Sequence, residues 1–347
     1  MLSDFCTLFD VNFLPRGLVL YRSLAQVCPD LRLRVFCMDE PTRTVLDRMA
    51  LPGLIPIGLE ELEAHDAGLL EVKPTRTRAE YCWTATPAVC LYALEREPGL
   101  QAITYLDADL MFFSDPGVLF AELGDDSVLI TPHRYSPRWQ GNEAPFGRYN
   151  IQLVTFRRDE RGLNALRWWR ERCLEWCYDR TEDGRYGDQK YLDDWSQRFP
   201  GVRVLEHVGG GLAPWNVANY RLERAGATVL VDGRPLVFYH YSWLELYHRL
   251  GAVVMALFSR GYGFVRRPVP LVWATPYFVS PSEMDLVFVP YVKALSHVLA
   301  DVRRVAPGFE GGLRTVPMRE VGRRIARRLH VASSERVPEA ATSDRPS

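Results

Sequence analysis

FCTLFD (residues 5–10), LPRGLVLYRSLAQV (14–27) and LRLRVFCMD (31–39) follow one another near the start of the chain and decide its fold class. The first and third stretches are mainly apolar, which predicts strands, and the second has apolar residues at helical spacing, which predicts a helix. A strand, a helix and a second strand form a βαβ unit with parallel strands and a right-handed crossover. The sequence therefore predicts an α/β protein with a parallel sheet.

Later segments extend this pattern. AITYLDADL (102–110) begins with a near-continuous apolar run, which is typical of a central strand covered on both faces. SVLITP (127–132) and IQLVTF (151–156) predict two more strands. ATVLVDGRPLVFYHY (227–241) predicts a hairpin that turns at Asp232–Gly233.

Length and composition describe a globular protein. The chain has 347 residues, of which 47% are hydrophobic and 24% charged, so it can bury a large core. Its formal net charge is -1, which gives no overall attraction to nucleic acid. We expect a main domain over residues 1–247, a helical C-terminal extension packed on it over 248–332, and a disordered tail of polar composition over 333–347.

Neither a secretory leader nor a membrane span is predicted. The start, MLSDFCTLFDVNF, has no basic leader followed by a continuous apolar stretch. The stretch LGAVVMALF (250–258) is far shorter than the roughly 20 residues that a membrane-spanning helix needs. The seven cysteines show no paired CxxC spacing and are interpreted as reduced thiols. We therefore expect a cytoplasmic protein.

Asp107 and Asp109 follow the central predicted strand one residue apart. In an open parallel sheet, ligands bind outside the carboxyl ends of the strands. Two carboxylates held close together repel each other unless a cation lies between them. The pair therefore fits either a divalent metal site or a structural arrangement in which Asp107 caps a turn and Asp109 faces solvent.

The segment HVGGGLAPW (207–215) is a second group of residues that could bind a ligand. It offers an imidazole at a strand end, followed by glycines whose bare backbone can approach a phosphate closely. A proline and a tryptophan end the segment.

These segments resemble motifs of the family 8 retaining glycosyltransferases, which use nucleotide-diphosphate sugars. The segment 207–215 resembles their HxxGxxKPW motif, and Asp107-Ala108-Asp109 resembles their DxD motif. TLFDVNFLPRGLVLYRSL (7–24), YNIQLVTF (149–156) and GDQKYLDDW (187–195) resemble, in the same order, the nucleotide-binding strand and helix, the FNAGVLL segment and the DQD-type loop. The likeness covers about residues 5 to 245, and within the family the chain most resembles a bacterial group of nucleotide-diphospho-sugar transferases.

The resemblance implies a fold and a role for each matching residue. The fold would be GT-A, a Rossmann-like, mixed but mainly parallel sheet flanked by helices, here with a helical C-terminal extension. Asp107, Asp109 and His207 would hold Mn2+ or Mg2+, with the nitrogen ligand favouring Mn2+. Asp188 would orient a sugar hydroxyl and Gln189 would lie near the anomeric carbon. The donor would further be bound by Asp10, Asn12, Arg76, Arg78, Asn150, Gly209, Gly210 and Trp215.

Some of these residues have plain structural interpretations as well. Asp10 and Asn12 also fit a turn and N-cap before the first helix, and Asp188 fits the N-cap of QKYLDDWSQRF (189–199). His240 is a second imidazole at a strand end, which fits either a ligand or acceptor-site residue or a buried, hydrogen-bonded histidine.

The chain departs from the family pattern at three positions. Ala213 stands where the motif has lysine, so another cation must meet the diphosphate, and Arg76 or Arg78 is predicted to do so. Trp83 stands where many relatives have arginine, and Gln152 where they have glycine, which predicts a different sugar pocket.

The predicted function is metal-dependent transfer of a sugar, with retention, from a nucleotide-diphosphate donor such as a UDP-sugar to a glycan or lipid-linked acceptor. A non-catalytic protein of the same fold that binds a nucleotide sugar or glycan is one alternative, for which Ala213 is the main argument. A haloacid-dehalogenase-type phosphatase is another, but its DxD motif would lie near the N-terminus and carry a small hydroxylic residue where Leu110 stands.

The stretch MREVGRRIARRLHV (318–331) predicts a basic amphipathic helix. Val321, Ile325 and Leu329 form one apolar stripe, and five arginines occupy the remaining surface. Such a helix can lie at an anionic membrane surface or dock onto the domain by its stripe. Peripheral contact with the inner face of the cell membrane would suit the lipid-linked acceptors of envelope polysaccharide synthesis that the resemblance implies.

Overall fold

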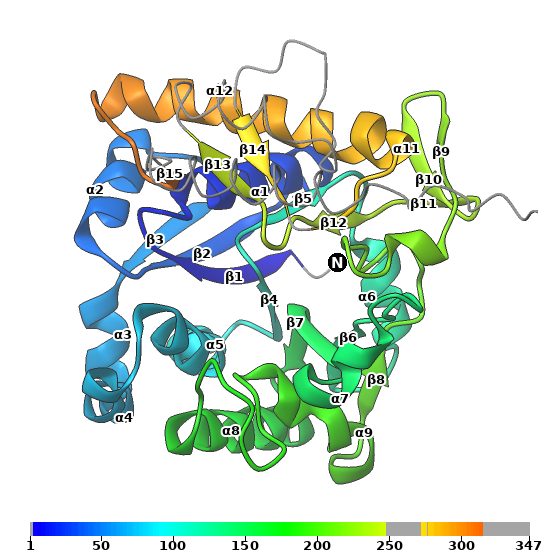
Figure 1. Ribbon diagram of the computed structural model, residues 1–347. Helices are drawn as coiled ribbons and strands as arrows, with labels where there is room; N and C mark the ends of the chain where they lie inside the picture. Colours follow the sequence, from blue (N-terminus) through cyan, green and yellow to red (C-terminus); the bar gives the residue numbers. More distant parts are fainter. Residues whose placement is uncertain (1–2, 248–271, 276, 315–347) are drawn as a thin grey trace, which may run out of the picture.

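The computed structural model of the protein describes residues 3–247, 272–275 and 277–314. Its centre is a seven-stranded sheet with the strand order β3-β2-β1-β4-β7-β6-β8 (Figure 1). The strands are β1 (Asp4–Phe9), β2 (Arg32–Cys37), β3 (Leu54–Gly58), β4 (Ala102–Leu106), β6 (Val128–Pro132), β7 (Tyr149–Arg157) and β8 (Val202–Val204). Only β7 runs antiparallel to its neighbours, β4 and β6, and the remaining pairs in this sheet are parallel. The predicted mixed, mainly parallel sheet flanked by helices is confirmed.

Helices cover both faces of the sheet, which explains why the central strands are apolar throughout. Figure 1 shows α1 (Leu14–Val27) and α12 (Val289–Val305) above the sheet, and α5 (Arg78–Arg96) and α8 (Glu160–Glu175) below it. Two hydrophobic cores result, one on each face. All five residues of β4 are buried, as expected of a strand packed on both sides.

Shorter elements complete the described part of the chain. The helices are α2 (Glu40–Met49), α3 (Leu59–His65), α4 (Ala67–Val72), α6 (Gly117–Leu123), α7 (Glu143–Phe146), α9 (Trp195–Arg198) and α11 (Pro281–Glu283), with a π-helix at Met284–Phe288 and a 3-10 helix at Gln189–Asp194. The strands are β5 (Leu110–Phe112), β9 (Leu222–Ala225), β10 (Thr228–Val231), β11 (Arg234–Pro235) and β12 (Phe238–His240). The predicted hairpin is shorter than expected: β10 and β11 pair around the turn at Asp232 and Gly233, both with positive φ, whereas β12 leaves the hairpin and pairs with β5. None of the described helices has the length and hydropathy of a membrane span.

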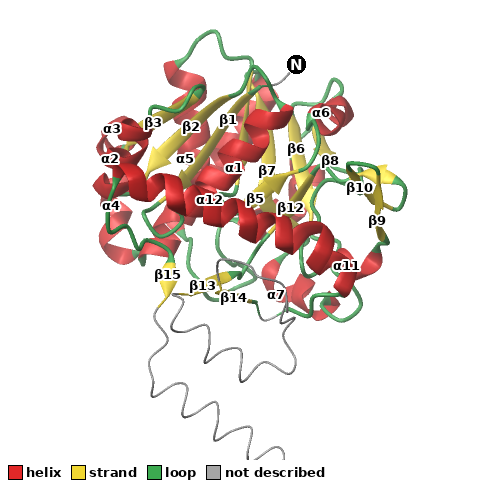
Figure 2. Cartoon of the chain, turned by 90° about the horizontal axis from the view of Figure 1, so that it is seen from above, coloured by secondary structure: helices red, strands yellow, loops and turns green. Residues whose placement is uncertain are grey.

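The C-terminal part of the described chain packs against the first βαβ unit. In the view from above, α12 lies across α1 (Figure 2). The strands β13 (Glu245–Tyr247), β14 (Val272–Ala274) and β15 (Leu313–Arg314) form a small sheet that joins residues on both sides of the expected boundary at residue 247. The predicted basic helix at 318–331 and the tail at 333–347 lie outside the described residues.

Two glycines bring this C-terminal part against the loop between β1 and α1. A Cβ atom on Gly311 would lie 2.4 Å from the carbonyl oxygen of Val11, and one on Gly312 would lie 2.2 Å from that of Asn12. Gly312 also has a φ of +76°, which favours glycine. The segment before β15 is therefore a wall of the region where β1 ends.

Candidate functional site

Asp107, Asp109 and His240 come together at the carboxyl end of β4. Both aspartates lie between β4 and β5, and β5 pairs antiparallel with β12 so that Leu110 faces His240. This register brings the imidazole Nε2 of His240 to 3.0 Å from Asp109 Oδ1 and 3.8 Å from Asp107 Oδ2. One ligand atom from each residue lies within 4.8 Å of the other two. Two carboxylates and an imidazole nitrogen fit Mn2+ or Mg2+.

The charges in this group depend strongly on one another. Burial raises the pKa of Asp107 to about 6, with repulsion from Asp109 adding to the effect and His240 opposing it. Burial would also raise the pKa of Asp109, but the charge and hydrogen bond of His240 lower it overall. The same two carboxylates raise the pKa of His240 against the effect of its burial. The aspartates therefore stabilise a positive partner, which is the electrostatic condition for binding a cation.

His207 lies elsewhere, which corrects the prediction that it supplies the third ligand. It follows β8, at the edge of the sheet, with β6 and β7 between β8 and β4. Its Nδ1 accepts a hydrogen bond from the backbone N–H of Gly209 at 3.1 Å. Among the described residues, His240 is the histidine that pairing of distant strands brings to the aspartates.

The glycines after His207 have a packing role in this structure. A Cβ atom on Gly209 would lie 2.0 Å from the carbonyl oxygen of Pro235, and one on Gly210 would lie 2.8 Å from Leu119 Cδ2. The N–H of Gly209 donates to His207 Nδ1 and that of Gly210 to the His207 carbonyl. Both N–H groups are thus already used inside the loop, so the predicted approach to a phosphate finds no support here.

Trp215 and Ala213 are both buried, and Trp215 packs against His240 of the three possible ligands Asp107, Asp109 and His240, which are called the metal group below. The Trp215 indole N–H donates to the carbonyl oxygen of His133 at 3.0 Å, and its ring meets the His240 ring edge to face, with centroids 5.3 Å apart. Trp215 therefore holds the imidazole rather than presenting a face to solvent. Ala213 is fully buried, and its N–H donates to the Asn216 side chain. The position that carries lysine in the resembled motif thus lies in the core.

Asp188, Gln189 and Asn150 lie on the α5 and α8 side of the same sheet end. The Asp188 carboxyl is buried, and burial together with the nearby negative charge of Asp107 raises its pKa to about 8. Gln189 Oε1 accepts from Asn150 Nδ2 at 3.1 Å, and its Nε2 donates to the carbonyl of Phe146 at 2.7 Å. Asp188, Gln189 and Asn150 are called the polar group below: Gln189 is bonded to Asn150, and Asp188 lies near enough to Asp107 for their charges to interact.

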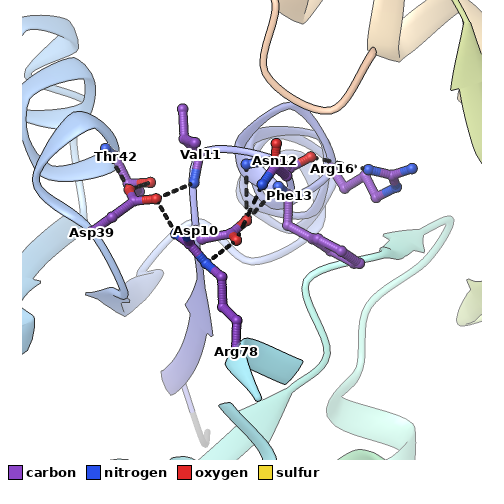
Figure 3. Close-up of polar contacts among 8 residues, drawn as sticks. All are labelled: Asp10, Val11, Asn12, Phe13, Arg16, Asp39, Thr42 and Arg78. Atoms are coloured by element: carbon purple, nitrogen blue, oxygen red, sulfur yellow. Dashed lines mark hydrogen bonds and ion pairs between the residues drawn. The ribbon is translucent and has the colours of Figure 1, made fainter. Parts of the chain in front are cut away.

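Asp10 organises the loop that leads from β1 into α1 (Figure 3). Its Oδ1 accepts the N–H groups of Asn12 at 2.8 Å and Phe13 at 3.2 Å, which is the turn that the alternative interpretation predicts. Its Oδ2 lies 2.5 Å from Arg78 Nε, and Arg78 also pairs with Asp39, the N-cap of α2. Arg78 therefore bridges two carboxylates at the ends of β1 and β2.

Arg76 contacts α8 and the segment that follows it, and not Asp107 or Asp109. Its Nη2 donates to the carbonyl of Leu174 at 3.1 Å, and its guanidinium lies 3.9 Å from the centre of the Tyr178 ring. These contacts fix Arg76 to the end of α8.

Arg16 is a residue of this region that sequence reasoning missed. It lies in the first turn of α1 and is 7% exposed. Its positive charge contributes to the lowered pKa of Asp109, after the larger contributions of burial and His240. A signal was present in the sequence, because Arg16 lies on the same helical stripe as Leu20 and Leu24, which are fully buried.

Comparisons with known proteins identify relatives that match most of the chain. No family model matches it. The uncharacterized protein YfnF of Bacillus subtilis (strain 168) is 36% identical over 323 residues, which cover 90% of this chain and 97% of that protein. The uncharacterized protein YfnD of the same organism is 30% identical over 312 residues, which cover 89% and 93%.

Similar solved structures include two glycosyltransferases. A structure of the galactosyltransferase LgtC with donor and acceptor sugar analogues has a TM-score of 0.47 and 16% identity, and covers 71% of this chain and 90% of that one. Mouse xyloside xylosyltransferase 1 in its apo form has a TM-score of 0.44 and 14% identity, and covers 69% and 97%.

Proposed function

The chain belongs to the family of the Bacillus subtilis proteins YfnF and YfnD, and from its candidate site and its sequence resemblance we propose that it is a metal-dependent glycosyltransferase with a nucleotide-diphosphate sugar as donor. UDP is the proposed nucleotide, and the acceptor is a glycan or a lipid-linked glycan. Retention of configuration and the GT-A name follow from the sequence resemblance to family 8.

The observation that carries the proposal is the convergence of Asp107, Asp109 and His240 at the carboxyl end of β4. A ligand of an open α/β sheet binds at this end. The donor set fits a hard divalent ion, and such an ion would act as a Lewis acid on the departing diphosphate. Asp107, Asp109 and His240 would hold the ion, and Trp215 keeps the His240 ring in position.

The polar group beside the ion site is proposed to receive the sugar. Asp188, which burial and Asp107 bias toward its protonated form, can donate a hydrogen bond to a sugar hydroxyl. Gln189 is oriented by Asn150 and by the Phe146 carbonyl, so that its amide is held in one direction beside the sheet end. Preorganised dipoles of this kind stabilise charge that develops in a transition state.

The direct test is release of UDP from a panel of UDP-sugars, with Mn2+, with Mg2+ and with EDTA. Slow transfer to water suffices for detection, so no acceptor needs to be known. We expect release from at least one sugar with a metal and none with EDTA, and none from the Asp109→Asn variant. The same panel with GDP-, ADP- and dTDP-sugars covers the other bases. Absence of release from every donor would contradict a transferase.

The second candidate is a non-catalytic protein that binds a nucleotide sugar or glycan. The burial of Ala213 favours it, because that position places no cation on a diphosphate. A shift of the thermal unfolding midpoint by UDP-sugars with Mn2+, without any UDP release, would identify such a binder.

Location at the inner face of the cell membrane is a further part of the proposal, through the basic stretch 318–331. Flotation with anionic liposomes, comparing the full chain with one truncated before Met318, tests it. Equal recovery of both proteins with the lipid would exclude this stretch as the anchor, and recovery of neither would exclude membrane contact.

A further inference from the structure

A diphosphate bound at the aspartates needs a cation from the protein. Asp107 and Asp109 already offset the charge of a divalent ion, so the phosphates would remain uncompensated. The basic side chains predicted for this task are committed elsewhere. Arg78 pairs with Asp10 and Asp39, and Arg76 is bound to Leu174 and Tyr178.

Arg16 is a buried arginine with no carboxylate partner in the described part of the chain. Its Nη1 donates to the carbonyl of Asn12 at 3.2 Å, and its Nη2 donates to that of Leu244 at 2.7 Å. Its guanidinium also lies 4.8 Å from the centre of the Phe13 ring. These neutral partners orient the guanidinium without neutralising its charge. That charge acts on the nearby Asp109, but no ion pair with a carboxylate of the described residues compensates it. Figure 3 shows the side chain pointing away from Arg78 and Asp10.

The packing of α1 on β5 puts Arg16 beside the metal group. Ser23 Oγ accepts the N–H of Phe112 at 3.0 Å, which fixes α1 against β5. Going back from Ser23 to Arg16 along the helix covers about 10 Å, and going back from Phe112 to Asp109 along the strand also covers about 10 Å. These equal lengths are consistent with Arg16 lying beside Asp109, and the action of both charges on Tyr291 and of Arg16 on Asp109 supports this placement.

Backbone contacts of the turn after β12 also place Arg16 near Asp109. The carbonyl of Asp109 accepts the N–H of Tyr241 at 3.0 Å. Tyr241 begins a turn whose last residue, Leu244, supplies the carbonyl that Arg16 binds. A single turn of chain thus connects Asp109 and the Arg16 guanidinium.

We propose that Arg16 binds the diphosphate of the nucleotide donor, as the buried cation of the site. This inference rests on the proposed function. The guanidinium is held by two carbonyls before the ligand arrives, so little side-chain entropy is lost when a phosphate oxygen takes a third N–H. A bidentate donor also suits phosphate better than a lysine would.

Titration calorimetry of the full chain with UDP and with uridine, both at saturating MnCl2, tests the proposal. Uridine shares the base and ribose of UDP but has no phosphate. Arg16→Gln should weaken UDP binding at least tenfold, the factor given by loss of one charge-assisted hydrogen bond. Binding of uridine, and of Mn2+ alone, should stay within about twofold of the parent. Arg16→Lys should keep part of the UDP affinity.

Arg22→Gln is the matched control, because Arg22 is on the same helix and pairs with Asp301 of α12. It should bind UDP as the parent does. Arg16→Lys, which retains the charge, serves if Arg16→Gln does not fold. Unchanged UDP affinity in the Arg16 variants overturns the proposal. So does an equal loss for UDP and uridine, since Arg16 would then only position the Asn12 loop.

Tighter Mn2+ binding with unchanged UDP affinity would show that Arg16 only balances the aspartates, and would also overturn the proposal. Failure of the parent to bind any nucleoside diphosphate with Mn2+ is a different result, because it refutes the proposed function itself.

Discussion

Two segments of the molecule each present a histidine at the end of a strand, and the structure uses them differently. His240 ends β12, and its ring meets Asp107 and Asp109. His207 follows β8, and its ring and carbonyl accept the N–H groups of Gly209 and Gly210. The local sequence around His207 is the one that resembles a metal-binding motif. Strand order, rather than the local motif, decides which histidine reaches the aspartates.

The largest expected effect comes from removing the His240 imidazole. His240→Gln should lower the affinity for Mn2+ more than 100-fold, because loss of a direct ligand exceeds the 10–100-fold typical of outer-shell partners. Asp109→Asn should have a similar effect. Titration of the protein with Mn2+, followed by electron paramagnetic resonance of the free ion, measures it.

The fold should survive both His240→Gln and Asp109→Asn, because each substitute can occupy the position of the side chain that it replaces. Far-ultraviolet circular dichroism and the thermal unfolding midpoint provide the control. If His240→Gln binds Mn2+ as tightly as the parent, His240 is not a ligand, and His207 is again a candidate for the third ligand.

The glycines of the His207 segment should affect stability rather than binding. Gly209→Ala should cost about 3 kcal/mol of unfolding free energy, because its Cβ would lie 2.0 Å from the Pro235 carbonyl, which cannot move independently of the backbone. Gly210→Ala should cost only about 1 kcal/mol, because its Cβ would meet the flexible ends of Leu119 and Leu205. Urea unfolding measures both.

Nucleotide affinity separates this packing role from the phosphate role that the sequence predicted. UDP binding with Mn2+ should be parent-like in Gly210→Ala. A loss of UDP affinity without loss of stability would mean that the loop opens to meet a phosphate.

The comparison also shows which features can be read from sequence. The βαβ opening, the apolar β4 and the Asp232–Gly233 turn depend on local periodicity and turn chemistry, and all were predicted. Asp107 and Asp109 were found because the end of a buried strand is also a local feature. His240 was left open between two interpretations, because its contact with Asp109 depends on the pairing of β12 with β5, far apart in the chain. Arg16 was missed although its place on the stripe of Leu20 and Leu24 was a signal, because the long side chain of an arginine on such a stripe often reaches solvent, and here it is buried.

His133 is a buried histidine that contacts Trp215 and is affected by the charge of His240, and its titration should make stability depend on pH. Its carbonyl accepts from Trp215, and its buried ring has a pKa lowered to about 3, by burial first and by the charge of His240 second. Between pH 6.5 and 3 the unfolded chain binds a proton that the folded chain does not, so stability is lost as the pH falls through this range. From pH 7.5 to 5.5 the loss should be ~1.4 kcal/mol.

Urea unfolding in EDTA at these two pH values, for the parent and for His133→Gln, isolates this contribution. The parent should lose ~1.4 kcal/mol more than the variant over the interval. Equal losses in the two proteins would show that His133 titrates as an exposed histidine does.

The smallest effect is expected for His207 itself. His207→Gln removes the ring nitrogen that accepts from Gly209, and a single neutral hydrogen bond contributes about 1 kcal/mol. Because the amide oxygen of glutamine can take over part of this role, we expect a loss of unfolding free energy below that value and Mn2+ affinity within about twofold of the parent. Paired with His240→Gln in the same titration, this variant gives the sharpest contrast between the two segments. A large loss of Mn2+ affinity here, with stability unchanged, would mean that the segment after β8 moves to the aspartates when the ion binds.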